Sequence, residues 1–304
     1  MTIEPDSERY GSMERASFFA DYGELLALKG GTVRRATLED LIEDLASQKK
    51  EIVFDPSRDE DEEWTFERIA EDAWSCLQDR ASELDDLYPF DVAAATLRLK
   101  PGIDPTQYAY VGLLAVTISH AFSLSRPNEV ENLFEILVTE ALQSAGLRAE
   151  SLGEIARTSS NFDQTLAELG RRLGIATTSR GVHHRVGAKD EDVDIVAELL
   201  FGFPRETRWF YVGQVTCGKS DTWRYKATEP SLSDWKSFLG DLVEPVGFLA
   251  VPHHMESSAL GYVAGAGRRL LDRLHLTKHL SSPGTRVGEV IAAVMASETQ
   301  SMGV

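Results

Sequence analysis

The sequence has little cysteine and no long apolar run. Its 2 cysteines, Cys76 and Cys217, stand far apart and form no pair at zinc-binding spacing. The longest apolar run, residues 108–118, is interrupted by Gly112 and is too short to span a bilayer. The first residues are acidic and lack the basic-then-apolar order of a signal peptide. We therefore expect a reduced, cytoplasmic protein without membrane contact.

Several common catalytic and nucleotide-binding motifs are also missing. The chain contains no Walker A, GxGxxG or GxSxG sequence. The glycines at 265 and 267 lack the preceding strand and the later acid of a dinucleotide-binding fingerprint. These absences leave no motif for a P-loop, a dinucleotide site or a serine nucleophile.

Basic residues are outnumbered, with 31 Lys and Arg against 49 Asp and Glu, and the formal net charge is -18. This balance at first argues against nucleic-acid binding. The acidity is uneven, however: residues 1–125 carry -14, residues 126–199 carry -5 and residues 200–304 carry +1. The acidic first part faces either a basic partner subunit or solvent.

Hydrophobic spacing divides the chain into two predicted domains. Residues 1–125 show helical patterns, including a capping box at 37–40 and an apolar helix at 106–121, which predict an all-helical domain for assembly or DNA positioning. Residues 126–304 alternate helices and short strands, which predicts an α/β domain with a mixed sheet flanked by helices. Its expected elements are helices at 129–145, 163–173, 231–242 and 268–280, and strands at 193–197, 209–217 and 246–251.

Polar side chains interrupt two of these apolar strands. Asp194 lies in Val193–Ala197, and Gln214 lies in the following strand, which is succeeded by Lys219. Burying an acid and an amide in short strands is costly unless both have partners. Their position is explained if the polar groups meet at a bound metal ion and a phosphate.

Phosphodiester hydrolysis requires a divalent cation, an activated water and positive charge near the phosphate. Mg²⁺ or Mn²⁺ accepts carboxylate and carbonyl oxygens, which makes Asp194 and Gln214 the expected metal ligands. Lys219 is the expected cation that assists water and phosphate. Glu135 interrupts the apolar helix pattern Phe134–Val138 and is expected to reach the same metal site.

These residues carry a resemblance to a known family. Glu135 in its helix, Asp194 in Val193–Ala197 and Gln214 before Val215 and Thr216 resemble the core of PD-(D/E)XK nucleases. The resemblance is closest to the branch of Mrr-like restriction endonucleases, where glutamine replaces the second acid. It implies a restriction-endonuclease-like mixed sheet, magnesium dependence and DNA cleavage over roughly residues 126–280.

The chain departs from the family pattern at the lysine. The family lysine stands two positions after the acid or glutamine, where this chain has Thr216, and Lys219 follows five positions after Gln214. A long lysine side chain can place the same charge from a displaced backbone position. Two alternatives stay open: a non-cutting adaptor subunit that keeps the nuclease scaffold, and an RNA nuclease using the same site.

The biological setting expected from the resemblance is restriction or anti-phage defence. The segment 267–276 and the N-terminal extension resemble nuclease-like subunits of bacterial defence systems. An acidic chain binds DNA poorly alone, because phosphate contacts require clustered basic charge. We therefore expect a partner subunit, such as an ATPase or a sensor, that supplies the basic surface.

Other candidates compete for a functional role. Asp192 and Glu198 share strand parity with Asp194 and are substitutes for it if the register differs. The loop 181–185, with two histidines, and Lys189 are placed to contact phosphates, or form an ordinary loop.

Three further groups have simpler structural explanations. His253 and His254 lack a third zinc ligand at useful spacing, and Cys217 has no histidine partner. A basic stripe on the expected helix 268–280 contacts either a DNA backbone or solvent; it consists of Arg268, Arg269 and Arg273.

Overall fold

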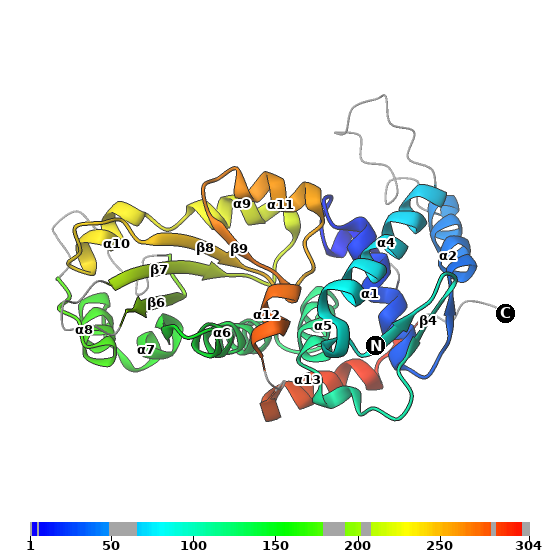
Figure 1. Ribbon diagram of the computed structural model, residues 1–304, viewed down its shortest axis with the longest axis horizontal. Helices are drawn as coiled ribbons and strands as arrows, with labels where there is room; N and C mark the ends of the chain where they lie inside the picture. The colour runs from blue at the N-terminus through cyan, green and yellow to red at the C-terminus, as the bar shows by residue number, and fades with distance from the viewer. Residues whose placement is uncertain are drawn as a thin grey trace.

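The computed structural model describes residues 2–4, 6–48, 66–178, 192–201, 208–280 and 284–299. Figure 1 shows a sheet with its helices at one end of the long axis and a second group of helices with a small sheet at the other. The second group contains both the N-terminal segment and the last helix of the chain.

A five-stranded mixed sheet forms the first end, which confirms the predicted α/β class. Its order is β5-β6-β7-β8-β9, in which β5, β6 and β7 are antiparallel and β7, β8 and β9 are parallel. The parallel pairs require crossover segments, and helices supply them. The strands are β5 (Arg148–Ser151), β6 (Ile195–Leu200), β7 (Arg208–Val215), β8 (Val246–Ala250) and β9 (Arg269–Leu271).

Helices cover both faces of this sheet because its strand residues alternate between two cores. Ile195 and Ala197 of β6 join the same apolar cluster as Phe134, whereas Val196 joins Trp235 in a separate cluster. The flanking helices are α6 (Pro127–Ser144), α7 (Leu152–Thr158), α8 (Phe162–Leu173), α9 (Ser220–Thr228), α10 (Leu232–Phe238) and α11 (Ser257–Ala264).

The predicted helix 268–280 is wrong in its first turn. Residues 269–271 form β9 at the edge of the sheet, and α12 (Arg273–His279) starts only afterwards. Asp272 separates the two elements, since its Oδ1 accepts the backbone N–H groups of Leu274 and His275 at 3.0 and 3.1 Å. The three arginines therefore do not form one helical stripe.

The N-terminal half is not all-helical, which corrects the second fold prediction. Besides its helices it contains an antiparallel sheet of β2 (Val33–Arg34), β4 (Thr96–Leu99) and β3 (Phe90–Val92), in that order. Pro89 prevents continuation of the preceding helix, and the segment after it folds back as a hairpin with Phe90 and Leu97 buried. The helices are α1 (Arg15–Leu28), α2 (Arg35–Gln48), α4 (Phe66–Leu84) and α5 (Ala109–Ala121).

The C-terminal end returns to the N-terminal half. Helix α13 (Gly284–Ala296) packs along α5, and β10 (Glu298–Thr299) pairs in parallel with β1 (Thr2–Ile3). One apolar cluster contains residues from both halves, including Phe18, Leu113, Phe134 and Val287. The division between residues 125 and 126 remains a prediction.

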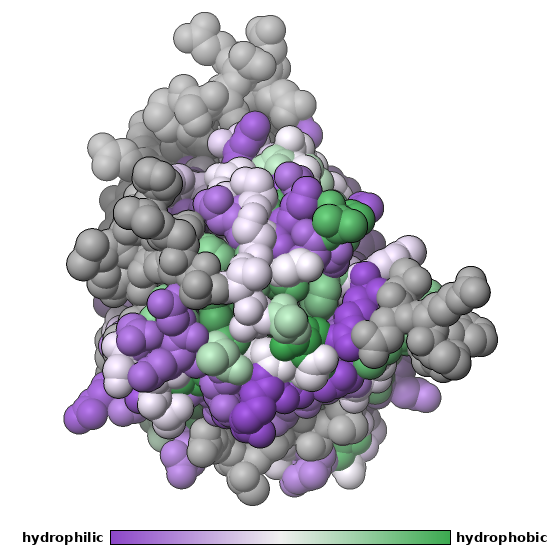
Figure 2. Space-filling model, turned by 90° about the vertical axis from the view of Figure 1, so that its left-hand side faces the viewer, coloured by the Kyte–Doolittle hydropathy of each residue, from purple (hydrophilic) through white to green (hydrophobic). Residues whose placement is uncertain are grey.

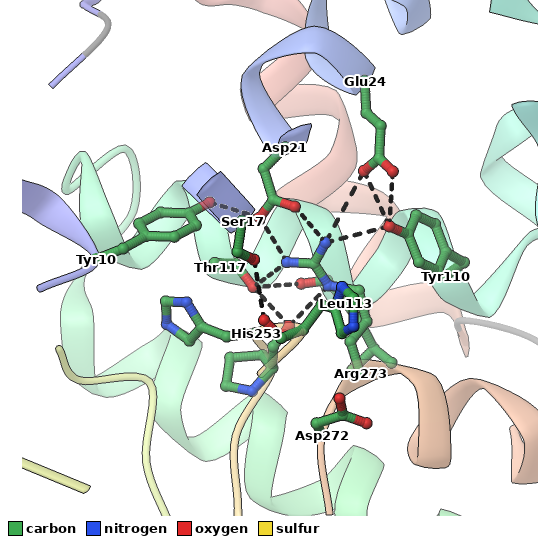
Figure 3. Close-up of polar contacts among 12 residues, drawn as sticks. Tyr10, Ser17, Asp21, Glu24, Tyr110, Leu113, Thr117, His253, Asp272 and Arg273 are labelled. Carbon is green, nitrogen blue, oxygen red and sulfur yellow. Dashed lines mark hydrogen bonds and ion pairs between the residues drawn. The ribbon is translucent and has the colours of Figure 1, made fainter. Parts of the chain in front are cut away.

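A buried network of charges joins these halves. Asp21 in α1 accepts bonds from Nη1 and Nη2 of Arg273 in α12, both at 2.7 Å. Arg273 also donates to the Pro252 carbonyl at 2.8 Å and to the Thr117 hydroxyl at 3.0 Å (Figure 3). Both members of the ion pair are at most 1% exposed, so water does not screen it.

A second arginine completes the network from α4. Arg80 lies 2.8 Å from Asp21 and 2.9 Å from Glu24, and its Nε donates to His254 at 3.1 Å. The hydroxyls of Tyr88 and Tyr110 donate to Glu24 at 2.6 and 2.8 Å. Burial opposes ionisation of Asp21, but Arg273 and Arg80 outweigh it and hold its pKa well below the usual range.

None of the helices in the described residues has enough apolar length to span a membrane.

Replacing Asp21 by Asn should strongly destabilise the protein, because it leaves an excess of buried positive charge at Arg273 and Arg80. We expect a loss of about 3–5 kcal/mol in the free energy of unfolding, measured by urea denaturation. Asp91→Asn is the control, since its pair with Arg98 at 3.3 Å lies on the surface and should contribute little. Equal effects of the two variants would contradict the proposed importance of the network.

Acid should destabilise the protein through His253 and His254, which are both buried. Burial, together with nearby Arg273 or Arg80, lowers the pKa of each to about 3. The unfolded chain takes up these protons below about pH 6.5, so stability is complete above that pH and falls toward about pH 3.

Urea unfolding at several pH values measures this slope, which is at most about 1.4 kcal/mol per pH unit for each histidine. His253→Gln should make the slope shallower, while the surface control His279→Gln should leave it unchanged. A slope that His253→Gln does not alter would contradict the assignment.

Candidate functional site

Asp194 and Gln214 lie opposite each other where β6 begins and β7 approaches its end. Ile195 pairs with Gly213, and the same register continued by one residue sets Asp194 beside Gln214. The Asp194 N–H donates to the Gly213 carbonyl at 3.0 Å, and the Val215 N–H donates to Asp194 Oδ2 at 2.7 Å. The structure thus brings these two predicted residues together.

The fold fixes the orientation of Gln214. Its Nε2 donates to the Asp192 carbonyl at 2.8 Å, and the side chain is buried. Asp192 has φ 59°, a left-handed conformation that aspartate tolerates better than most residues. Because the amide nitrogen is engaged, Oε1 is the atom of Gln214 suited to bind a cation.

A second lysine, Lys226, lies on α9, the helix that follows β7. Burial lowers the pKa of Lys226 in α9, but the hydrogen bond and charge of Glu229 and the charges of Asp194 and Asp192 raise it overall. Lys226 Nζ lies 2.8 Å from Glu229, and its side chain is 38% exposed. Its ammonium group is therefore held by Glu229 and is partly open to solvent.

Lys219 occupies a different place. It precedes the first turn of α9 as its N-cap residue and is exposed. The next residue, Ser220, donates its N–H to the Tyr10 carbonyl at 2.8 Å, so this end of α9 rests on the N-terminal segment. In the part of the chain described, no hydrogen bond or ion pair connects Lys219 with Asp194 or Gln214. Its catalytic role remains a prediction.

Glu135 is held behind the strand ends. Its Oε1 accepts the Ser151 hydroxyl and the Gly153 N–H, the latter at 3.1 Å, at the start of α7. The intervening Leu152 donates its N–H to the Asp194 carbonyl at 2.7 Å. Burial raises the pKa of Glu135, against the opposing effect of its two hydrogen bonds. These contacts of Glu135 fix the backbone of residues 151–153, which lies next to Asp194.

The competing acid Glu198 shares the predicted face of β6 but serves the fold. It is fully buried and pairs with Arg148 at 2.8 Å and Arg208 at 3.2 Å. Four residues separate it from Asp194, roughly 13 Å along a strand. It is therefore too distant to replace Asp194 at the strand ends.

The predicted basic residues after β8 have separate structural roles. Arg268 donates to the carbonyls of Ala227 and Pro230 at 2.9 and 3.3 Å, and Arg269 is exposed on β9. Arg273 belongs to the buried network. The loop 181–185 and Lys189 lie outside the described residues.

Cys217 and the two histidines face the interior. Cys217 is 4% exposed, and burial raises the pKa of its thiol. His253 Nε2 lies 3.5 Å from the Cys217 carbonyl, and His254 accepts a bond from Arg80. These contacts hold the loop after β8 in the core.

A metal ion bound by Asp194 and Gln214 would need most of its ligands from other groups. Among the described residues, no group of three His, Cys, Asp or Glu side chains is arranged to hold a metal ion. One carboxylate and one amide oxygen suit Mg²⁺, which commonly retains several waters and binds substrate phosphate. The donor set thus fits a weakly bound magnesium ion completed by substrate.

A depression of about 810 Å³ lies at the other end of β7. Its lining includes Arg208, Trp209 and residues 239–246, and none of the candidate site residues. Figure 2 shows hydrophobic side chains on this end of the molecule with hydrophilic ones around them. The depression is a separate surface feature.

Comparisons with models of protein families, with curated proteins and with solved structures found no match to this chain.

Gly153 should be essential for the position of Glu135. A Cβ atom at Gly153 would lie 2.6 and 2.7 Å from the two carboxylate oxygens of Glu135. Gly153→Ala must displace this carboxylate and break its bonds, so we expect a loss of about 1–3 kcal/mol in urea unfolding. Gly288→Ala in α13 is the matched control, because nothing lies within 4 Å and alanine favours helices.

A double variant, Gly153→Ala with Glu135→Ala, tests the cause of this loss. Removing the carboxylate removes the clash, so the two substitutions should not add. Strict additivity would show that the cost of Gly153→Ala arises elsewhere.

Proposed function

We propose that this protein is a metal-dependent nuclease that hydrolyses DNA phosphodiester bonds at the strand ends of β6 and β7. The observation that carries the proposal is the placement of Asp194 opposite Gln214, with Lys226 on the helix that follows β7. A carboxylate, an amide oxygen and an ammonium group are the chemical groups that phosphodiester hydrolysis requires.

The arrangement of the sheet supports this proposal. The resemblance to PD-(D/E)XK nucleases implies a central mixed sheet with an acid on one strand and glutamine on the next. The five-stranded sheet has Asp194 and Gln214 on neighbouring strands, and Glu135 in the helix before them. A restriction-endonuclease-like fold is thus our preferred description of residues 126–280.

Each residue has a defined part in the proposed reaction. Asp194 and the Oε1 of Gln214 would hold Mg²⁺ or Mn²⁺, which lowers the pKa of a water and polarises the phosphate when bound. Lys226 presents its ammonium to the phosphate and stabilises negative charge as the nucleophile attacks. Glu135 supports Asp194 through Ser151, Leu152 and Gly153, and its direct contact with a metal remains a prediction.

Lys226 is our preferred substitute for the family lysine. At the family position, Thr216 stabilises the turn after β7, since its hydroxyl accepts the Gly218 N–H at 3.0 Å. Buried Trp223 and Ala227 anchor α9 against the sheet, so the helix is a fixed support for Lys226. The cation of the proposed site would therefore come from α9, the helix that follows β7.

The acidity of the chain favours action within a complex. With a net charge of -18 the protein would need a basic partner to hold DNA firmly. We propose that this basic partner is an ATPase or sensor subunit of a restriction or anti-phage assembly. Such a partner would also restrain a toxic nuclease.

A second candidate function is a non-cutting adaptor subunit. One oxygen of Asp194 accepts the Val215 N–H, and the amide nitrogen of Gln214 is bonded to Asp192. These contacts stabilise the strand ends without a metal, so the pair has a structural use of its own. Cleavage of RNA by the same residues is the other alternative.

Nuclease assays with matched lysine variants test the proposal. Plasmid DNA is incubated with the protein, alone and with its co-purifying partners, in Mg²⁺ or Mn²⁺. Asp194→Asn should reduce cleavage roughly 100-fold or more, and Lys226→Ala by a similar factor, because each removes charge stabilisation at the phosphate. Lys219→Ala should remain near wild type.

The outcomes separate the alternatives. Loss of cleavage in Lys219→Ala, with Lys226→Ala active, would return the catalytic role to Lys219. Cleavage that survives Asp194→Asn would refute the site. Inactivity with every metal and partner favours the adaptor, and cleavage of RNA in place of plasmid DNA identifies an RNA nuclease.

A further inference from the structure

Two tyrosines are exposed on neighbouring helices, unlike the buried tyrosines of the core. Tyr225 in α9 is 68% exposed and Tyr262 in α11 is 46% exposed. Helices α9 and α11 pack against each other and lie side by side in Figure 1. Their rings contribute little to the core and are available to a ligand.

An arginine is stacked on one of these rings. The guanidinium carbon of Arg224 lies 4.6 Å from the centroid of the Tyr262 ring, and both side chains are exposed. Stacking restricts the flexible arginine to a flat arrangement while its charge remains. A flat cation beside an exposed ring suits a ligand that has both aromatic faces and negative charge.

The geometry of α9 connects this surface to the candidate site. Ser220, Trp223 and Ala227 form the buried stripe of α9, which leaves Arg224 and Tyr225 on the solvent side. Helix α9 starts five positions after the end of β7, where Gln214 lies, and it contacts β7 and β8. A ligand stacked on Tyr225 is therefore held next to the helix that supplies the proposed cation.

The charge around the tyrosines is favourable to a polyanion. Residues 200–304 carry +1, whereas residues 1–199 carry -19. Helix α11 has no charged residue, and the two acids nearest along α9 are engaged: Asp221 with Ser12 and Glu229 with Lys226. Arg224 supplies positive charge directly beside the two exposed rings.

We propose that Arg224, Tyr225 and Tyr262 form a stacking surface that binds single-stranded nucleic acid. This surface leads the bound strand to the Asp194–Gln214 site. Aromatic rings can stack only on bases whose faces are exposed, as in a single strand. The inference rests on the proposed nuclease function for its purpose, but the binding is measurable without cleavage.

Fluorescence anisotropy tests the surface in the full chain without divalent metal. The probes are labelled oligothymidylate, oligouridylate and a DNA duplex of equal length. We expect the single strands to bind better than the duplex. Tyr225→Ala and Tyr262→Ala should each weaken that binding roughly 5- to 150-fold, the range for loss of one stacked base.

Conservative and remote variants complete the design. Tyr225→Phe should retain affinity because it keeps the ring, and Arg224→Leu should weaken binding and reduce its salt dependence. Trp209→Ala is the control, since Trp209 is 54% exposed at the opposite end of β7. Circular dichroism confirms that each variant is folded.

The results distinguish this inference from the proposed function. Single-strand binding that depends on the tyrosines, without cleavage by the wild type, supports the surface and counts against the nuclease. Tyrosine variants that bind like the wild type, preference for duplex, or an equal loss in Trp209→Ala would overturn the surface. The DNA and RNA probes identify which single strand is preferred.

Discussion

The ion pairs of Arg273 and Arg80 with Asp21 and Glu24 constrain the whole molecule. An unpaired charge in a protein interior costs several kcal/mol, so α1, α4 and α12 must meet in one arrangement. The hydroxyls of Tyr10, Tyr88 and Tyr110 donate to the two carboxylates, and the Thr117 hydroxyl accepts an N–H of Arg273. Apolar packing alone would allow these helices to slide, whereas directional charge pairs specify their positions.

This constraint reaches the candidate site through the N-terminal segment. The Tyr10 hydroxyl donates to Asp21 at 2.8 Å, and the Tyr10 carbonyl accepts the N–H of Ser220, the first residue of α9. The same helix carries Lys226 and the solvent-exposed Tyr225. The N-terminal half therefore helps to position the helix that carries Lys226, the cation that we propose for the site in the sheet. We infer that the two halves act as one unit in any chemistry performed there.

The candidate site combines rigid support with open coordination. Backbone bonds fix Asp194, and Asp192 fixes the amide nitrogen of Gln214. Glu135 secures the start of α7 beside them and needs glycine at 153 for its carboxylate to fit. Such support favours a ligand that completes its own coordination, as a hydrated magnesium ion on a phosphate does. In our proposal, the exposed rings on α9 and α11 hold the remainder of a nucleic-acid chain.

The sequence by itself determined the α/β class, the mixed sheet and the neighbourhood of Asp194 and Gln214, because alternating apolar residues and a polar interruption are local patterns. It did not reveal the hairpin after Pro89, since three-residue strands leave little periodic signal. Only the tertiary structure decided that the start of α9 meets Tyr10, and that Asp21 meets Arg273 across 252 positions of sequence. Such contacts depend on how helices pack against the sheet and on which charges burial forces together, and neither is written in local spacing.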